Sequence, residues 1–76
     1  MIEKEGDVTI EWFPFQYQED TLLCISLATW GAVIFDGHSN YHIAHVTMPK
    51  WWPDERQVEV AQNLVSLIEL RRTNHD

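Results

Sequence analysis

The sequence predicts a small α+β domain: an antiparallel sheet of three or four strands with one C-terminal helix packed on it. Three observations lead to this class. Alternating apolar and polar residues fill short stretches in the first two thirds of the chain, a turn dipeptide at Asp36 and Gly37 separates two of them, and a helical apolar pattern fills the last third. A one-sided sheet and a one-sided helix bury their apolar faces most simply by packing together.

The first two expected strands follow from alternation. In residues 7–15 apolar side chains alternate with polar ones until Pro14, which cannot donate a hydrogen bond to a neighbouring strand. This strand therefore lies at an edge of the sheet or ends at Phe13. Residues 21–30 permit either a helix, started by cap signals at the beginning of the run, or a buried strand, and their alternation favours the strand.

The clearest hairpin lies in the middle of the chain. Residues 31–35 and 41–48 are rich in β-forming side chains and flank a five-residue polar connection that begins with Asp36 and Gly37. We therefore expect two neighbouring antiparallel strands here.

The last third is predicted to be one amphipathic helix that follows a corner bracketed by two prolines. Pro53 suits the first helical turn, and Asp54 and Glu55 complement the positive end of the helix dipole. Arg71 and Arg72 complement the negative end. The apolar residues expected on one broad face, against the sheet, are Val60, Ala61, Leu64, Val65, Leu67 and Ile68.

The chain is expected to form a single domain over residues 1–76, with ends that can fray at 1–6 and 73–76. Its longest apolar run, residues 21–35, is about five residues shorter than a bilayer span, so we expect no transmembrane helix. Its only cysteine, Cys24, lies inside that run and reads as a small buried side chain. The absence of a cysteine pair favours a reducing, cytoplasmic compartment.

The last 45 residues or so carry a resemblance. A strand led by Trp30, the turn at Asp36 and Gly37, the segment YHIAHV at 41–46 and the helix ending VAQNLVSLIEL are similar to small phage and prophage accessory proteins of unassigned role. Those proteins often contain a strand, a glycine turn, a strand with the letters IA and then a helix. The resemblance implies a virus-encoded helper or inhibitor that acts in the host cytoplasm.

The negative charge is concentrated at the N-terminus. Residues 1–20 contain six acidic side chains and one basic one, which accounts for −5 of the total −7. A field of this sign repels phosphate groups, so we expect neither direct nucleic-acid binding nor binding to an anionic membrane. A protein with a basic surface is the favoured charged partner. The alternative is a solvated face that serves only solubility.

Three histidines lie within eight residues. On a helix, His38, His42 and His45 would share one face and could reach one zinc ion. We expect a strand instead, on which His42 and His45 point to opposite faces while His38 is solvated in the turn. We therefore predict no metal site and no cofactor.

Aromatic side chains suggest a contact surface. Trp51 and Trp52 are adjacent, so one ring can cap the core while the other points outward as an interface anchor, or both can fold over the core. Four aromatic residues near the N-terminus stand beside acidic ones, which suits docking on a basic, partly apolar protein surface. The expected partner-binding residues are Glu3, Glu5, Asp7, Glu11, Trp12, Phe13, Phe15, Tyr17, Glu19, Asp20, Trp51 and Trp52.

These patterns predict a noncatalytic, acidic protein-binding module. In the form that the phage resemblance implies, it would be an inhibitor that occupies a basic surface of a host or defence protein, for instance a nucleic-acid-binding one. One alternative is a structural subunit whose exposed aromatic residues pair two copies into a homodimer. Another is a small metal-dependent enzyme that uses His38, His42 and His45. No catalytic residue is predicted, because no nucleophile or phosphate-binding loop has the required local context.

Overall fold

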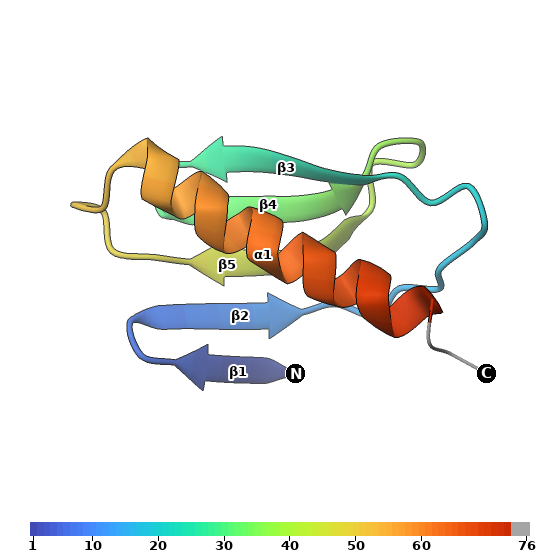
Figure 1. The fold of residues 1–76 in the computed structure, drawn as a ribbon, viewed down its shortest axis with the longest axis horizontal. Helices are drawn as coiled ribbons and strands as arrows, with labels where there is room; N and C mark the ends of the chain where they lie inside the picture. The colour runs from blue at the N-terminus through green and yellow to red at the C-terminus, as the bar shows by residue number, and fades with distance from the viewer. Residues whose placement is uncertain (74–76) are drawn as a thin grey trace.

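The computed structural model describes residues 1–73 and combines an antiparallel sheet with one helix (Figure 1). The predicted α+β class is confirmed, and the predicted number of three or four strands is too low, because the sheet has five strands. The elements are β1 (Ile2–Glu5), β2 (Val8–Trp12), β3 (Leu23–Ala28), β4 (Gly31–Asp36), β5 (His42–Thr47) and α1 (Asp54–Thr73).

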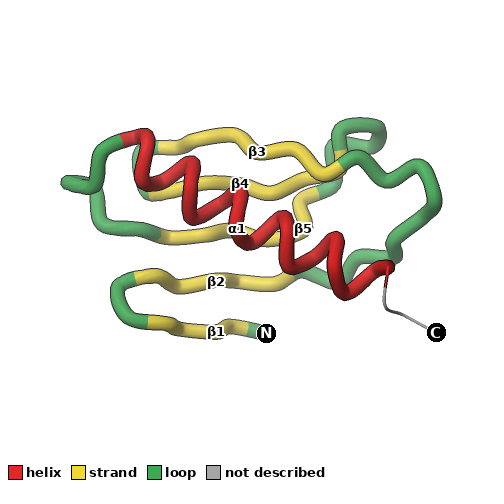
Figure 2. Tube along the Cα trace, viewed as in Figure 1, coloured by secondary structure: helices red, strands yellow, loops and turns green. Residues whose placement is uncertain are grey.

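The strand order is β1-β2-β5-β4-β3, and every neighbouring pair is antiparallel. β5 therefore lies at the centre, although it comes last in the sequence. The chain crosses from β2 to β3, on the other edge, through residues 13–22, a long connection that runs around the end of the sheet beside the C-terminal end of α1 (Figure 2). This connection forms one side of the cavity described below.

β1 is the strand that the sequence pattern did not predict. Its residues Ile2–Glu5 contain a single apolar side chain, so they show no hydrophobic alternation, and all four are exposed. They are held by backbone pairing to β2, in a register that joins Ile2 to Glu11 and Glu5 to Val8. β2 is consequently not an edge strand. It ends at Trp12, and the next N–H, that of Phe13, donates to the carbonyl of Ile43 at 3.0 Å.

Only the first of the two segments that were expected to fray lies wholly within the described residues. The segment expected to fray at residues 1–6 contains β1, and Gly6 turns the chain into β2 with a φ of 60°. At the other end, α1 extends to Thr73, and residues 74–76 lie outside the described part of the chain.

The strand reading of residues 21–30 is confirmed by β3, which pairs with β4 through a tight turn. Gly31, the first residue of β4, has a φ of 149°, and a Cβ atom at this position would lie 1.9 Å from the carbonyl oxygen of Val46. Only glycine lets the β3–β4 turn approach β5 this closely.

The hairpin predicted around Asp36 is confirmed as β4 and β5. The Asp36 carboxylate accepts hydrogen bonds from the backbone N–H of His38 at 3.1 Å, from the Ser39 hydroxyl at 2.8 Å and from the backbone N–H of Leu22 at 3.2 Å. The His38 and Ser39 hydrogen bonds, in that order, are the main causes that lower the pKa of Asp36. This one side chain therefore fixes the turn and ties it to the start of β3.

α1 lies diagonally across one face of the sheet and packs mainly on β3 and β4 (Figures 1 and 2). Its predicted apolar face is largely correct, since Ala61, Leu64 and Ile68 are buried. Leu67 is half exposed, contrary to expectation, because the helix touches the sheet along a narrow stripe. Among residues 1–73, no helix has the length and apolar character that crossing a membrane requires.

The core lies between α1 and the covered face of the sheet. Near the N-terminal end of α1, Gln57 is also buried, and its side-chain amide donates to the carbonyl of Trp52 at 2.9 Å. The core side chains come from the two strands β4 and β5, from the β5–α1 connection and from α1. The buried apolar residues are Ala32, Ile34, Ile43, Ala44, Val46, Met48, Trp52, Ala61, Leu64 and Ile68.

Candidate functional site

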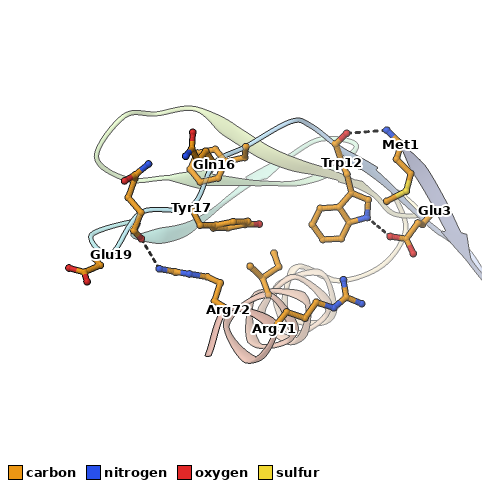
Figure 3. A pocket seen from close by; sticks show the side chains of 11 residues that line it. Met1, Glu3, Trp12, Gln16, Tyr17, Glu19, Arg71 and Arg72 are labelled. Carbon is orange, nitrogen blue, oxygen red and sulfur yellow. Dashed lines mark hydrogen bonds between the residues drawn. The ribbon is translucent and has the colours of Figure 1, made fainter. Parts of the chain in front are cut away.

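An open cavity of about 800 Å³ lies between the segment around residues 15–19 and the last turns of α1 (Figure 3). Its size falls within the range of small-molecule and side-chain binding sites. β1 and β2 supply one part of the lining, the β2–β3 connection supplies another, and α1 supplies the rest. The lining residues are Met1, Glu3, Trp12, Phe15, Gln16, Tyr17, Gln18, Glu19, Ile68, Arg71 and Arg72.

Three aromatic side chains form the apolar walls of the cavity. Trp12, at the end of β2, is held by two neighbouring groups: its indole N–H donates to Glu3 Oε1 at 2.5 Å, and its carbonyl accepts from the amino group of Met1 at 3.3 Å. Phe15 and Tyr17 meet edge to face, with ring centroids 5.0 Å apart and planes at 74°. Alternate positions of the extended connection thus turn Phe15 and Tyr17 to the same side.

Arg72 fastens the connection to α1. Its guanidinium forms an ion pair with Glu69 at 2.9 Å, donates to the carbonyl of Gln18 at 2.9 Å and lies 5.5 Å from the centre of the Tyr17 ring. Burial raises the pKa of the Tyr17 phenol, and the Arg72 charge lowers it by a smaller amount. The phenol therefore stays neutral and serves as part of the wall.

Charges of both signs rim the cavity. Glu3 and Glu19 stand at opposite ends of the lining, and Arg71 and Arg72 project from α1 between them (Figure 3). The charged side chains of the lining are thus two acids and two arginines, so the cavity is not acidic even though the surrounding segment is. The lining suits an uncharged, apolar or aromatic group.

The structure brings five of the twelve predicted partner-binding residues together in this lining, namely Glu3, Trp12, Phe15, Tyr17 and Glu19. The other N-terminal ones lie elsewhere. Glu11 and Phe13 are on the opposite face of the sheet, Glu5 and Asp7 flank the β1–β2 turn, and Asp20 is exposed in the connection.

The sequence patterns did not predict the part of the lining that α1 supplies. Arg71 and Arg72 were read only as partners of the helix dipole, and Ile68 only as a core residue. No local pattern shows that the β2–β3 connection passes the C-terminal end of α1, because that proximity arises from the strand order. The interaction between Arg72 and Gln18 joins residues 54 positions apart.

The adjacent tryptophans adopt opposite positions, as one of the two predicted arrangements requires. Trp52 is 7% exposed, and the Arg56 guanidinium lies 3.8 Å from the centre of its ring. Trp51 is 76% exposed. The exposed ring stands in the β5–α1 connection, at the same end of the sheet as the β1–β2 turn with its acidic residues, because Thr9 of β2 pairs with Thr47 of β5.

The face of the sheet opposite α1 is not covered by any described element and holds a second cluster of rings. His45 lies at its centre, with ring centroids 4.7 Å from Phe13, 5.3 Å from Trp30 and 4.9 Å from His42. We call these four residues the ring cluster. Beside it, a shallow hollow of about 230 Å³ is lined by Ser26, Val33, Phe35, Asn40 and His42.

The prediction that His42 and His45 point to opposite faces is wrong. Their rings are hydrogen-bonded, with His42 Nδ1 and His45 Nε2 2.8 Å apart. The cause is a bulge: Ala44 pairs with Ile34 but His42 pairs with the next residue, Phe35, so Ile43 is an extra residue on β5. The extra residue turns His42 to the face that His45 already occupies.

The predictions for His38 and Cys24 have different outcomes. His38 is exposed in the β4–β5 turn, as expected. Cys24 is a free thiol that is only half-buried, because its strand position directs it toward the uncovered face, where its neighbour across the ladder is Phe35. It is thus not part of the core.

Comparisons of the chain with protein-family models, with curated proteins and with solved structures found no match. The resemblance to phage accessory proteins stays a prediction.

Proposed function

We propose that this chain is a noncatalytic protein-binding module whose cavity receives an apolar or aromatic side chain of a partner protein with a basic surface. The observation that supports this most is the lining itself: residues of the first 20 that were expected to bind a partner meet around one open, aromatic-walled space. Apolar anchors that enter such pockets carry much of the affinity in protein complexes.

The charges outside the cavity define the surroundings of that anchor. The lining balances two acids against two arginines, so the inserted group is uncharged. The adjoining edge of the sheet carries exposed acids, among them Glu5 and Asp7, with little positive charge to offset them. Basic side chains around the partner's anchor would meet these acids, and such complementarity acts chiefly on the association rate.

The resemblance to phage accessory proteins is the basis for the biological role that we propose. A phage-encoded module of this kind would act as an inhibitor in the host cytoplasm, where it would cover a basic surface of a host or defence protein. A nucleic-acid-binding surface suits this role, because the acidic module would compete with phosphate groups for the same cations.

The experiment compares two identical substitutions. Tyr17→Ser removes one wall of the cavity, whereas Tyr41→Ser removes a ring that is 69% exposed in the β4–β5 turn and does not line the cavity. Both variants and the unmodified chain are used to capture proteins from a lysate of the source organism's host, and captured proteins are identified by mass spectrometry. Binding constants are then measured with each purified partner.

We expect a partner whose dissociation constant rises about tenfold or more with Tyr17→Ser and changes little with Tyr41→Ser. Its association rate should fall as salt is raised, because screening shortens the reach of the acidic residues. A partner that tolerates Tyr17→Ser as well as it tolerates Tyr41→Ser would contradict the proposal. So would a set of captured proteins that does not differ between the two variants.

A further inference from the structure

The His42 and His45 pair on the uncovered face has the arrangement of half a metal site. The two facing nitrogens are 2.8 Å apart, in a hydrogen bond that a single proton bridges. Two nitrogens bound to one tetrahedral zinc ion at 2.0–2.1 Å stand about 3.3 Å apart. A small rotation of the exposed His42 ring would open the pair by the required half ångström or so. The ring that donates the bridging proton would take the tautomer that carries its proton on the other ring nitrogen, which leaves both facing nitrogens free to bind zinc.

One chain does not complete such a site. Within residues 1–73, no group of three or more histidine, cysteine, aspartate or glutamate side chains is placed to hold a metal ion. Structural zinc sites have four protein ligands. The missing two ligands can come from the same pair on a second copy, because a two-fold axis through the metal repeats each residue once.

The face around the pair suits the approach of a second copy. Within the five described strands, its side chains include only two with a formal charge, Lys4 and Glu11, which cancel. The chain as a whole carries −7, so this is a surface on which two copies meet with little repulsion. The ring cluster and the half-buried Val33 and Phe35 supply apolar area.

The depth of the layers also fits. Two stacked sheets lie about 10 Å apart, and an imidazole that stands out from its sheet reaches about half of that separation. Imidazoles that reach this far from both copies would meet at the midplane. The hollow of about 230 Å³ beside His42 leaves space for a side chain of the other copy, and Phe13 and Trp30 against His45 would shield the metal from water.

We propose that zinc joins two copies of this chain through His42 and His45 of each, with the uncovered faces of the two sheets packed together. The inference is independent of the cavity, which lies on the other side of the sheet. The proposed site depends on the extra residue in β5, because without the bulge the two histidines would not share a face.

The test measures mass as zinc is added. Sedimentation and native mass spectrometry are carried out on the full chain with zinc chloride and again after EDTA. We expect a monomer without metal, a dimer with one zinc per two chains when zinc is present, and a return to monomer with EDTA. His42→Gln should abolish the zinc-dependent dimer, while His38→Gln, a change at the exposed turn histidine, should leave it intact.

Each other result overturns the proposal. Zinc bound one per chain to a monomer would show that water or another group completes the site. A dimer that persists in EDTA, or one that survives His42→Gln, would show that the histidines do not bridge the copies. His42 is exposed, so we expect the variant to melt at the wild-type temperature; His45→Gln gives a second, separate test. Tyr17→Ser should dimerise with zinc normally, which separates this result from the proposed function.

Discussion

The two faces of the sheet are built from alternate residues of the same strands, yet they differ in what covers them. On β4 and β5 the residues that face α1, among them Ala32, Ile34, Ala44 and Val46, are fully buried. Their neighbours on the other face, such as Val33 and His45, are only half-buried. The strands therefore contribute apolar side chains in both directions, while the single helix can cover only one of them.

The difference between the two faces concerns stability. The covered face and α1 form the core, which is the one buried apolar cluster among residues 1–73. The uncovered face buries less apolar area, so it should contribute less to the free energy of folding. The same substitution should consequently lower the free energy of unfolding by different amounts on the two faces.

The largest effect is expected where the helix meets the covered face. Leu64→Ala should lower the free energy of unfolding by about 2–5 kcal/mol, because it leaves a cavity in the centre of the core. The matched control is Leu67→Ala on the same helix, at a residue that is 50% exposed, which should cost less than about 1 kcal/mol. Urea denaturation measures both. Equal losses would show that α1 does not pack on the sheet through this stripe.

A smaller effect compares the two faces directly. Val46→Ala removes buried atoms on the covered face and should cost about 2 kcal/mol, from two methyl-sized groups and the space they leave. Val33→Ala makes the same change on β4 toward the uncovered face and should cost about half as much. Both values come from the same denaturation experiment on the metal-free chain. If Val33→Ala cost as much as Val46→Ala, the uncovered face would be part of a second packed layer.

Local sequence patterns predicted the helix that covers the sheet and the hairpin beneath it. The spacing of Ala61, Leu64 and Ile68 predicted the helix and its buried stripe, and Asp36 with Gly37 predicted the β4–β5 hairpin. Both signals are local, because a turn or a helical face is specified by residues close together in the chain.

Features set by tertiary structure were not predictable in this way. β1 has one apolar residue and is held by backbone hydrogen bonds that any sequence can form. The bulge at Ile43 has no glycine or other marker, yet it decides whether His42 and His45 meet. The cavity depends on where residues 13–22 cross the end of the sheet, which follows from the strand order and from no single segment.

The smallest expected effect lies at the end of the sheet, outside both faces, and depends on pH. The folded state lowers the pKa of Asp36 through hydrogen bonds from His38, Ser39 and Leu22. Its ionised form thus stabilises the fold at any pH above the unfolded value of about 3.9, and this contribution is lost as pH falls through the lower, folded value. Asp36→Asn cannot ionise, so its melting temperature should lie below the wild-type one at neutral pH, and the gap should close as the solution is acidified below about pH 4. A gap that stays constant from pH 7 to about pH 2 would show that the shape of the side chain matters and its charge does not. A closing gap would show that the turn beside His42, and with it one end of the uncovered face, is held by an ionised carboxylate and not by apolar packing.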